Sequence, residues 1–280
     1  MRRGLAAGSR YNALVPKVRV DVLLVERGLA ETRAQAQALI MAGKVRLNGE
    51  PALKSGTAVD PAGRLEVVQG PRFVSRGGEK LEAALEAFSI DVSGLVCADV
   101  GASTGGFTDC LLQRGAARVY AMDVGKGILH WKLRNDPRVV VMEQTNARFL
   151  DGLPEPVSLA TIDASFISLR LLLPVVRVWL APGSGSLVVL IKPQFEAGRS
   201  DVRRGKGVIR DPQVHRQVLL EVLGSSEAQG LSVRGLLRSP LLGPKGNVEF
   251  LAWLAHAAST TLSVEALIEA ACAAPAQSQK

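Results

Sequence analysis

Two charged residues, Asp163 and Lys192, each come directly after an apolar run in the sequence. Residues 159–162 precede the aspartate and residues 187–191 precede the lysine. A charged group at the end of an apolar run is costly to bury unless it is paired or chemically useful. Because a lysine beside a carboxylate can orient a hydroxyl group or accept its proton, the two residues predict a site of proton transfer.

Two more charged residues occur where they could join this pair. Lys80 opens a helical segment, and Glu249 lies close to the last predicted strand. The apolar runs before Asp163 and Lys192 are typical of parallel strands, whose carboxyl ends meet at one edge of a sheet. We therefore expect Lys80, Asp163, Lys192 and Glu249 to form one catalytic cluster at that edge.

A glycine-rich turn in residues 98–108 joins a predicted strand to a predicted helix. This arrangement brings backbone close to a nucleotide-like ligand, and glycine permits sharp turns and close approach. A carboxylate at such a turn would repel a pyrophosphate but attract the ammonium group of S-adenosylmethionine. The turn therefore favours S-adenosylmethionine over NAD. The candidate contacts are Asp99, Gly101, Ser103, Thr104, Gly105, Gly106 and Phe107.

The next two predicted strands add further candidates for cofactor binding. Asp123 lies at the carboxyl end of residues 118–124, where its carboxylate can accept hydrogen bonds from both ribose hydroxyls of an adenosyl group. Asn146 follows the strand at 139–143, in a loop that would border the adenine. The three cysteines lack metal-binding spacing, so no metal is expected.

The strands that must position these residues alternate with helical segments, which predicts an α/β fold with a mainly parallel seven-stranded sheet. The last two strands are close together in sequence, so one of them is expected to be antiparallel. The predicted strands are 95–100, 118–124, 139–143, 157–163, 186–192, 231–238 and 247–254.

The chain of 280 residues divides in sequence into five predicted parts. We expect a flexible arm at 1–16, a small α+β domain at 17–70 and a linker at 71–76. The α/β domain follows at 77–256, with a C-terminal helix and tail at 257–280. The formal net charge is +8, and residues 1–70 hold eleven Lys and Arg against six Asp and Glu. This excess indicates a polyanionic partner.

The small domain resembles the S4 RNA-binding domain. The shared pattern runs from Arg19 and Asp21 through 28–30 and Thr32-Arg33 to 43–49. The resemblance implies that basic side chains contact structured RNA through phosphate and shape. The candidate RNA-binding residues here are Arg19, Arg27, Arg33, Lys44 and Arg46.

The whole chain resembles the TlyA (haemolysin-A-like) family. Lys80, Asp163, Lys192 and Glu249 match the Lys-Asp-Lys-Glu tetrad of FtsJ-like methyltransferases, and residues 75–78 and 192–196 match further family motifs. The resemblance implies a Rossmann-like methyltransferase that acts on the ribose 2′-hydroxyl of cytidine in ribosomal RNA. Lys192 would be the base or the hydroxyl-orienting group, held by Asp163, while Lys80 and Glu249 frame the ribose.

The segment 198–210 combines glycines with several cations and predicts a mobile lid that grips RNA. Its candidate RNA-binding residues are Arg203, Arg204 and Lys206.

Other readings remain open at the level of sequence. The chain could be an inactive ribosome-binding factor, and a pore-forming haemolysin is less consistent with the absence of a signal peptide or an apolar span. A cytoplasmic protein that binds ribosomal subunits, with no membrane partner, is expected. A monomer is plausible, but the sequence does not determine the oligomeric state.

Overall fold

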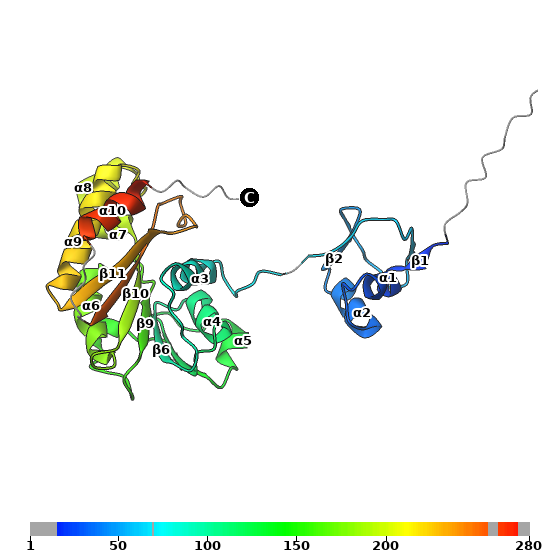
Figure 1. The fold of residues 1–280 in the computed structure, drawn as a ribbon, viewed down its shortest axis with the longest axis horizontal. Coiled ribbons are helices and arrows are strands. Elements are labelled where there is room, and N and C mark those ends of the chain that lie inside the picture. Colours follow the sequence, from blue (N-terminus) through cyan, green and yellow to red (C-terminus); the bar gives the residue numbers. More distant parts are fainter. Residues whose placement is uncertain (1–15, 69, 257–262, 274–280) are drawn as a thin grey trace, which may run out of the picture. The chain divides into compact units, whose positions relative to one another are not determined.

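The computed structural model describes residues 16–68, 70–256 and 263–273. Contacts divide the chain into two units, one up to Arg72 and one from Phe73 onward (Figure 1). The predicted arm falls almost entirely outside the described residues, as does part of the predicted tail. No helix in the described ranges is long and apolar enough to cross a membrane.

The first unit packs two helices against short strands. Thr32 caps the second helix by accepting a hydrogen bond from the Gln35 amide, which is why that helix begins at residue 33. Leu24, Ile40 and Val45 belong to a core made only of residues from this unit. The elements are β1 (Val18–Arg19), α1 (Val20–Glu26), α2 (Arg33–Met41), β2 (Val45–Leu47), β3 (Glu50–Pro51), β4 (Ala58–Val59) and β5 (Leu65–Val67).

The second unit contains a seven-stranded sheet in the order β11-β12-β10-β9-β6-β7-β8. Strand β12 runs antiparallel to both of its neighbours, and the other neighbouring pairs are parallel. The predicted mainly parallel sheet is confirmed. Its strands are β6 (Val96–Val100), β7 (Arg118–Met122), β8 (Val139–Met142), β9 (Leu159–Ile162), β10 (Ser186–Ile191), β11 (Leu231–Arg238) and β12 (Phe250–His256).

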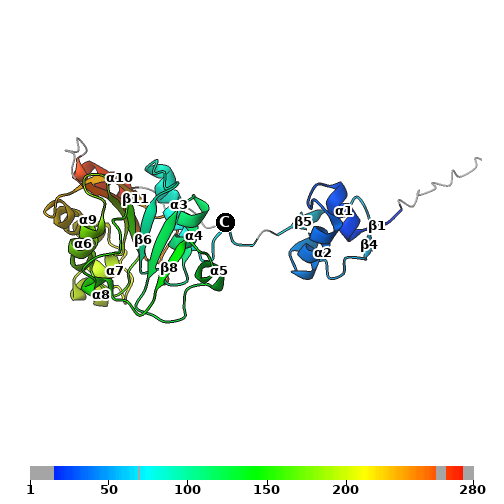
Figure 2. The same cartoon turned by 90° about the horizontal axis from the view of Figure 1, so that it is seen from below.

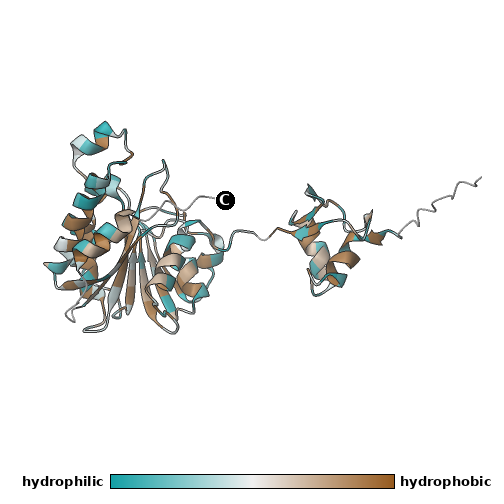
Figure 3. Cartoon of the chain, turned by 45° about the horizontal axis from the view of Figure 1, so that its top comes forward, coloured by the Kyte–Doolittle hydropathy of each residue, from teal (hydrophilic) through white to brown (hydrophobic). Residues whose placement is uncertain are grey.

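Helices cover both faces of this sheet (Figure 2). One face lies under α3, α4 and α5, and the other under α6, α9 and α10. The central strands are apolar on both sides because each side is buried, and Figure 3 shows them mostly brown between helices with teal outer faces. The helices are α3 (Gly77–Ala87), α4 (Gly106–Gln113), α5 (Trp131–Arg134), α6 (Leu169–Val176), α7 (Pro193–Glu196), α8 (Arg199–Arg204), α9 (Pro212–Glu227) and α10 (Val264–Ala273), with 3₁₀ turns η1 (Ala147–Phe149) and η2 (Arg177–Trp179).

The segment expected to be a linker at 71–76 is divided between the two units. Phe73 is buried and packs closely on Gly78, where an added Cβ would lie 2.3 Å from the Phe73 ring. The Val74 amide donates to Asp109 of α4. Residues 73–76 therefore belong to the second unit, because an aromatic side chain and a backbone bond hold them there.

Candidate active site

A pocket of about 740 Å³ opens at the carboxyl edge of the sheet in the second unit. The four residues of the predicted catalytic cluster all line it: Lys80, Asp163, Lys192 and Glu249. They come from α3, the end of β9, the end of β10 and the residue before β12. The structure thus brings together side chains that are up to 169 positions apart in sequence.

The first ion pair of the pocket joins Lys192 to Asp163. The Lys192 Nζ lies 2.5 Å from Asp163 Oδ1 and donates to Ser165 Oγ at 3.1 Å. It also lies 5.9 Å from the centre of the Phe195 ring, within the range of a cation–π contact. Lys192 is only 8% exposed. Its amine is therefore held in one place by an anion, a hydroxyl and a ring face.

The second ion pair joins Lys80 to Glu249, with 2.5 Å between Lys80 Nζ and Glu249 Oε2. Both side chains are buried. The other carboxylate oxygen, Oε1, lies against Gly243, where an added Cβ would approach it to 2.2 Å. A side chain at residue 243 would therefore push the Glu249 carboxylate out of its present position.

The glycine-rich turn forms one wall of the pocket through Gly101, Ser103, Thr104, Gly106 and Phe107. Gly101 and Gly105 have positive φ values, in agreement with the predicted sharp turn. A Cβ at Gly101 would lie 2.7 Å from the Asp163 carbonyl oxygen, and the residue has a φ of +82°. The glycine therefore allows the chain after β6 to lie against the chain after β9, because an added side chain would collide with the Asp163 backbone.

Gly105 does not line the pocket, contrary to expectation. It precedes α4 with a φ of +97°, and an added Cβ would lie 2.2 Å from a methyl group of Leu133. Its missing side chain makes room for α5. A glycine is therefore needed at this position for packing of the turn against α5.

Asp99 lies beneath the pocket rather than in its wall. The side chain is fully buried and accepts hydrogen bonds from Thr108 Oγ1 at 2.6 Å and Thr161 Oγ1 at 3.0 Å. Burial raises the pKa of the Asp99 carboxyl to about 6, against the opposing effect of the two threonine bonds. In this structure α4 and β9 cover the carboxylate, so its oxygens face the two threonines and not the pocket.

Asp123 supports the glycine-rich turn directly. One carboxylate oxygen accepts from the Ser103 amide at 2.9 Å, and the other accepts from the Gly125 amide at 2.8 Å. Each oxygen retains a lone pair for a further donor. Neither Asp123 nor Asn146 lines the pocket, and Asn146 caps η1 by accepting from the Arg148 amide.

Two phenylalanines at the pocket were missed by the sequence analysis. Phe166 is 91% exposed, and its ring centre lies 4.9 Å from that of Phe195. Both line the pocket. The position of Phe166, three residues after Asp163, was the one available signal. The exposed ring of Phe166, supported by the half-buried ring of Phe195, can stack on a nucleobase.

The C-terminal end of the predicted lid (residues 198–210) is hydrogen-bonded to residues that surround the pocket. Asn247 accepts from the Ile209 amide and donates to the Gly207 carbonyl, and His215 contacts the Ile209 carbonyl at 3.1 Å. Arg204 pairs with Asp201 within α8, while Arg203 and Lys206 are exposed. None of these three cationic side chains lines the pocket. The segment contributes Val202 and Gly207 to the lining instead.

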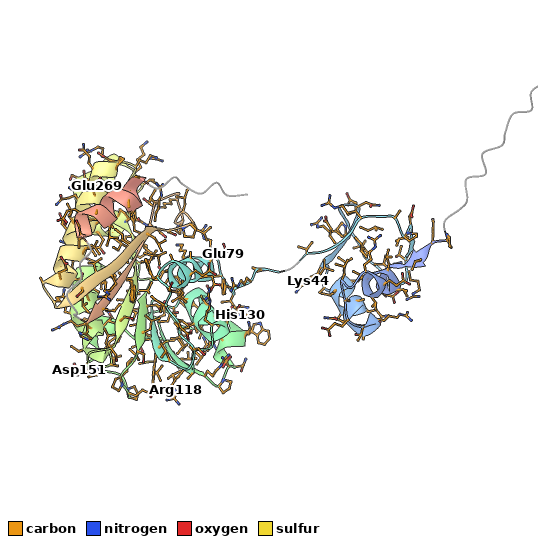
Figure 4. The ribbon with its side chains drawn as sticks, in the orientation of Figure 1. Lys44, Glu79, Arg118, His130, Asp151 and Glu269 are labelled. Atoms are coloured by element: carbon orange, nitrogen blue, oxygen red, sulfur yellow. The ribbon has the colours of Figure 1, made fainter. Side chains whose placement is uncertain are left out.

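In the first unit, the candidate RNA-binding residues differ in their contacts. Arg27 donates to the Pro61 and Gly63 carbonyls, and Arg46 donates to the Gly49 carbonyl. Lys44 is exposed at the margin of the unit (Figure 4). Arg19 and Arg33 both bind Asp21, a residue to which the sequence analysis gave no role.

No cluster suited to a metal ion occurs among the residues that the structure describes. His130, labelled in Figure 4, caps α5 by accepting from the Lys132 amide.

Comparisons with known proteins agree with this geometry. The family profile of FtsJ-like methyltransferases matches residues 73–256, and that of the S4 domain matches residues 18–64. YqxC of Bacillus subtilis is 54% identical over 84% of each chain. The "16S/23S rRNA (cytidine-2'-O)-methyltransferase TlyA" of Mycobacterium tuberculosis is 50% identical, over 91% of this chain and 96% of that one. A solved structure from Streptococcus thermophilus is 45% identical, covers 92% of this chain and 96% of its own, and superposes with a TM-score of 0.68.

Proposed function

The chain belongs to the TlyA family, in which an S4 domain precedes an FtsJ-like methyltransferase domain, and we propose that it methylates the ribose 2′-hydroxyl of a cytidine in ribosomal RNA. The observation that carries this proposal is the convergence of two lysine–carboxylate pairs in one pocket beside the glycine-rich turn. A cytoplasmic location follows from a ribosomal substrate.

The residues around the pocket fit S-adenosylmethionine. The volume of about 740 Å³ lies within the range of ligand sites and leaves room for a nucleoside beside the cofactor. Backbone at Gly101, Ser103 and Gly106 would border the cofactor, and Asp123 would accept hydrogen bonds from its ribose. When bound, S-adenosylmethionine supplies an electrophilic methyl group.

The chain's own residues would align and deprotonate the hydroxyl. A ribose hydroxyl is a weak nucleophile, so alignment and removal of its proton are the main contributions that a protein can make. Lys192 as a neutral amine would contact the 2′-oxygen and accept its proton, and the ammonium that results is the form that pairs with Asp163 and donates to Ser165. Lys80 and Glu249 form the opposite wall, where the pair would position the ribose.

Transfer of a labelled methyl group from S-adenosylmethionine to purified ribosomal subunits tests this function. We expect label on rRNA ribose with the unaltered protein and a loss of at least about 100-fold with Lys192→Ala. Lys192→Arg keeps a charge beside Asp163 but cannot accept a proton at neutral pH, so it should also be inactive. Unchanged melting temperatures would show that both variants fold.

Label that persists in Lys192→Ala would remove this lysine from the mechanism. RNA binding without label on either subunit or on free rRNA would favour the alternative, an inactive ribosome-binding factor.

A further inference from the structure

The first unit contains a buried carboxylate that is surrounded by cations at the surface. Asp21 of α1 is 0% exposed, and its two oxygens accept four hydrogen bonds from three side chains. Arg19 donates through Nε at 3.0 Å and Nη2 at 2.9 Å, Arg33 through Nη2 at 3.1 Å and Gln37 through Nε2 at 2.9 Å. One carboxylate thus joins β1, α1 and α2.

The arginines reach Asp21 with only part of their donor capacity. Arg19 uses the edge formed by Nε and Nη2, which leaves the edge formed by its two terminal nitrogens for a second acceptor. Arg33 uses a single N–H of its five. Their side chains remain 47% and 56% exposed. Both guanidinium groups are therefore fixed on one side and accessible to solvent on the other.

This arrangement distinguishes the two arginines from the other predicted RNA contacts of the unit. Arg27 and Arg46 donate to backbone carbonyls, which fix turns of the chain. Arg19 and Arg33 instead share an anion that holds two positive charges together. Two guanidinium groups around one carboxylate carry a net charge of +1, and planar N–H donors suit phosphate oxygens.

We propose that Asp21 is a positioning residue for RNA binding, which fixes Arg19 and Arg33 as a pair that binds backbone phosphates. This inference rests on the proposed function, since it assumes that the substrate is RNA. Holding the arginines in one conformation before binding reduces the entropy that they lose when they contact phosphate.

Replacing Asp21 with asparagine should change the affinity for RNA in the direction opposite to that expected from the change in net charge alone. Asp21→Asn removes a negative charge, so a purely coulombic effect would tighten binding to a polyanion. Loss of positioning would weaken it instead, because the neutral amide cannot hold two guanidinium groups as the carboxylate does. The matched control is Glu26→Gln, which removes an exposed negative charge from the same helix.

The experiment measures binding of the full-length protein to purified 30S and 50S subunits as a function of salt. For Asp21→Asn we expect about fivefold weaker binding at about 0.15 M salt. The salt slope, which is the slope of the logarithm of the binding constant against the logarithm of the salt concentration, should decrease in magnitude by about 0.9 for each phosphate that is no longer neutralised. Glu26→Gln should bind as tightly as the unaltered protein or more tightly. Equal or tighter binding by Asp21→Asn would overturn the proposal.

A second variant keeps the test valid if Asp21→Asn disturbs the fold. Arg19→Lys retains both Asp21 and the net charge. An ammonium group, however, lacks the two planar N–H edges with which a guanidinium group can contact a carboxylate and a phosphate at the same time. Arg19→Lys should also weaken binding to the subunits. The double variant with Asp21→Asn and Arg19→Lys should bind no more weakly than the weaker-binding single variant, because both changes disrupt the same group of hydrogen-bonded side chains. Full binding by Arg19→Lys would refute the proposed geometry.

Methyl transfer separates this proposal from the proposed function. Asp21→Asn should raise the KM for subunits and leave kcat within about twofold, since the pocket is formed by the second unit. If the unaltered protein neither binds subunits nor methylates them, the proposed function fails. If it does both and Asp21→Asn matches Glu26→Gln, only the role of Asp21 fails.

Discussion

Asp99 combines full burial with two hydrogen bonds from threonines, and its pKa is raised to about 6. An unfolded aspartate titrates near 3.9, so between these values the folded state binds more protons than the unfolded state. Stability from this group is therefore highest below about pH 4 and is lost as the pH rises through about 6. The full difference corresponds to about 3 kcal/mol.

We predict that urea unfolding at a series of pH values will show this loss in the unaltered protein relative to Asp99→Asn. The amide does not titrate, so the difference in unfolding free energy between the two proteins should change between about pH 4 and pH 6. A difference that is constant across this range would show that Asp99 has an ordinary pKa.

Phe166 is exposed beside the pocket and contacts Phe195. Stacking of a base on an aromatic ring contributes about 1–3 kcal/mol, so Phe166→Ala should lower kcat/KM for ribosomal subunits by about 10-fold. Phe166→Tyr retains the ring face and should keep most of the activity. The melting temperature should not change, because the side chain is not part of the core. Full activity of the alanine variant would exclude a stacking role.

At the scale of single residues, the sequence predicts charged groups better than aromatic ones. Asp163 and Lys192 could be found because each follows an apolar run that must be buried. A charge at the end of such a run is costly unless it is paired or functional. Phe166 has no comparable signal, since an apolar residue after a strand is usually in the core. The burial of Asp99 depends on the positions of Thr108 and Thr161, which only the packed sheet brings together.

At the scale of elements, Asn247 connects the segment before β12 to the loop that follows α8. Its side chain accepts from the Ile209 amide and donates to the Gly207 carbonyl, and it is buried. Asn247→Ala would leave the buried Ile209 amide without this acceptor, at a cost of about 2 kcal/mol. We expect a lower melting temperature and lower kcat/KM, because Gly207 and Val202 line the pocket.

Limited trypsin digestion measures the effect of Asn247→Ala on the loop. Trypsin cleaves after Arg203, Arg204 and Lys206, so cleavage in this segment should become faster when Asn247 is removed. Asn135→Ala is a suitable control, because Asn135 is exposed and bonds only locally, to the Trp131 carbonyl. Equal cleavage rates in both variants would contradict a role for Asn247 in holding the loop.

The elements themselves were largely predictable, and the reason is physical. Each strand of a parallel sheet is buried on both faces, so it appears as a short apolar run, and all seven predicted strands coincide with β6 to β12 within a few residues. The attachment of residues 207–209 was not predictable. It depends on a contact between residues 38 positions apart, and nothing in the local sequence of either segment indicates it.

At the scale of the whole molecule, most of the excess positive charge and the residues of the candidate active site belong to different units. Residues 1–70 hold five of the eight excess positive charges, whereas the pocket is lined only by residues of the second unit. The cores are also separate, since the first core contains residues between Val18 and Val67 and the other two contain only residues from Phe73 onward. The second unit should therefore fold when the first is removed.

A protein that begins at Pro71 keeps Phe73 and Val74, which belong to the second unit. We expect it to bind S-adenosylmethionine with the affinity of the full chain, as measured by calorimetry, because its pocket is intact. Binding to ribosomal subunits should weaken, and its salt slope should fall by about 2 to 3, or about one for each phosphate that the first unit neutralises. An unchanged slope would place RNA recognition on the methyltransferase domain, where Arg76 and Lys245 are exposed in the pocket lining and Arg203 and Lys206 are exposed on the segment that contributes Val202 and Gly207.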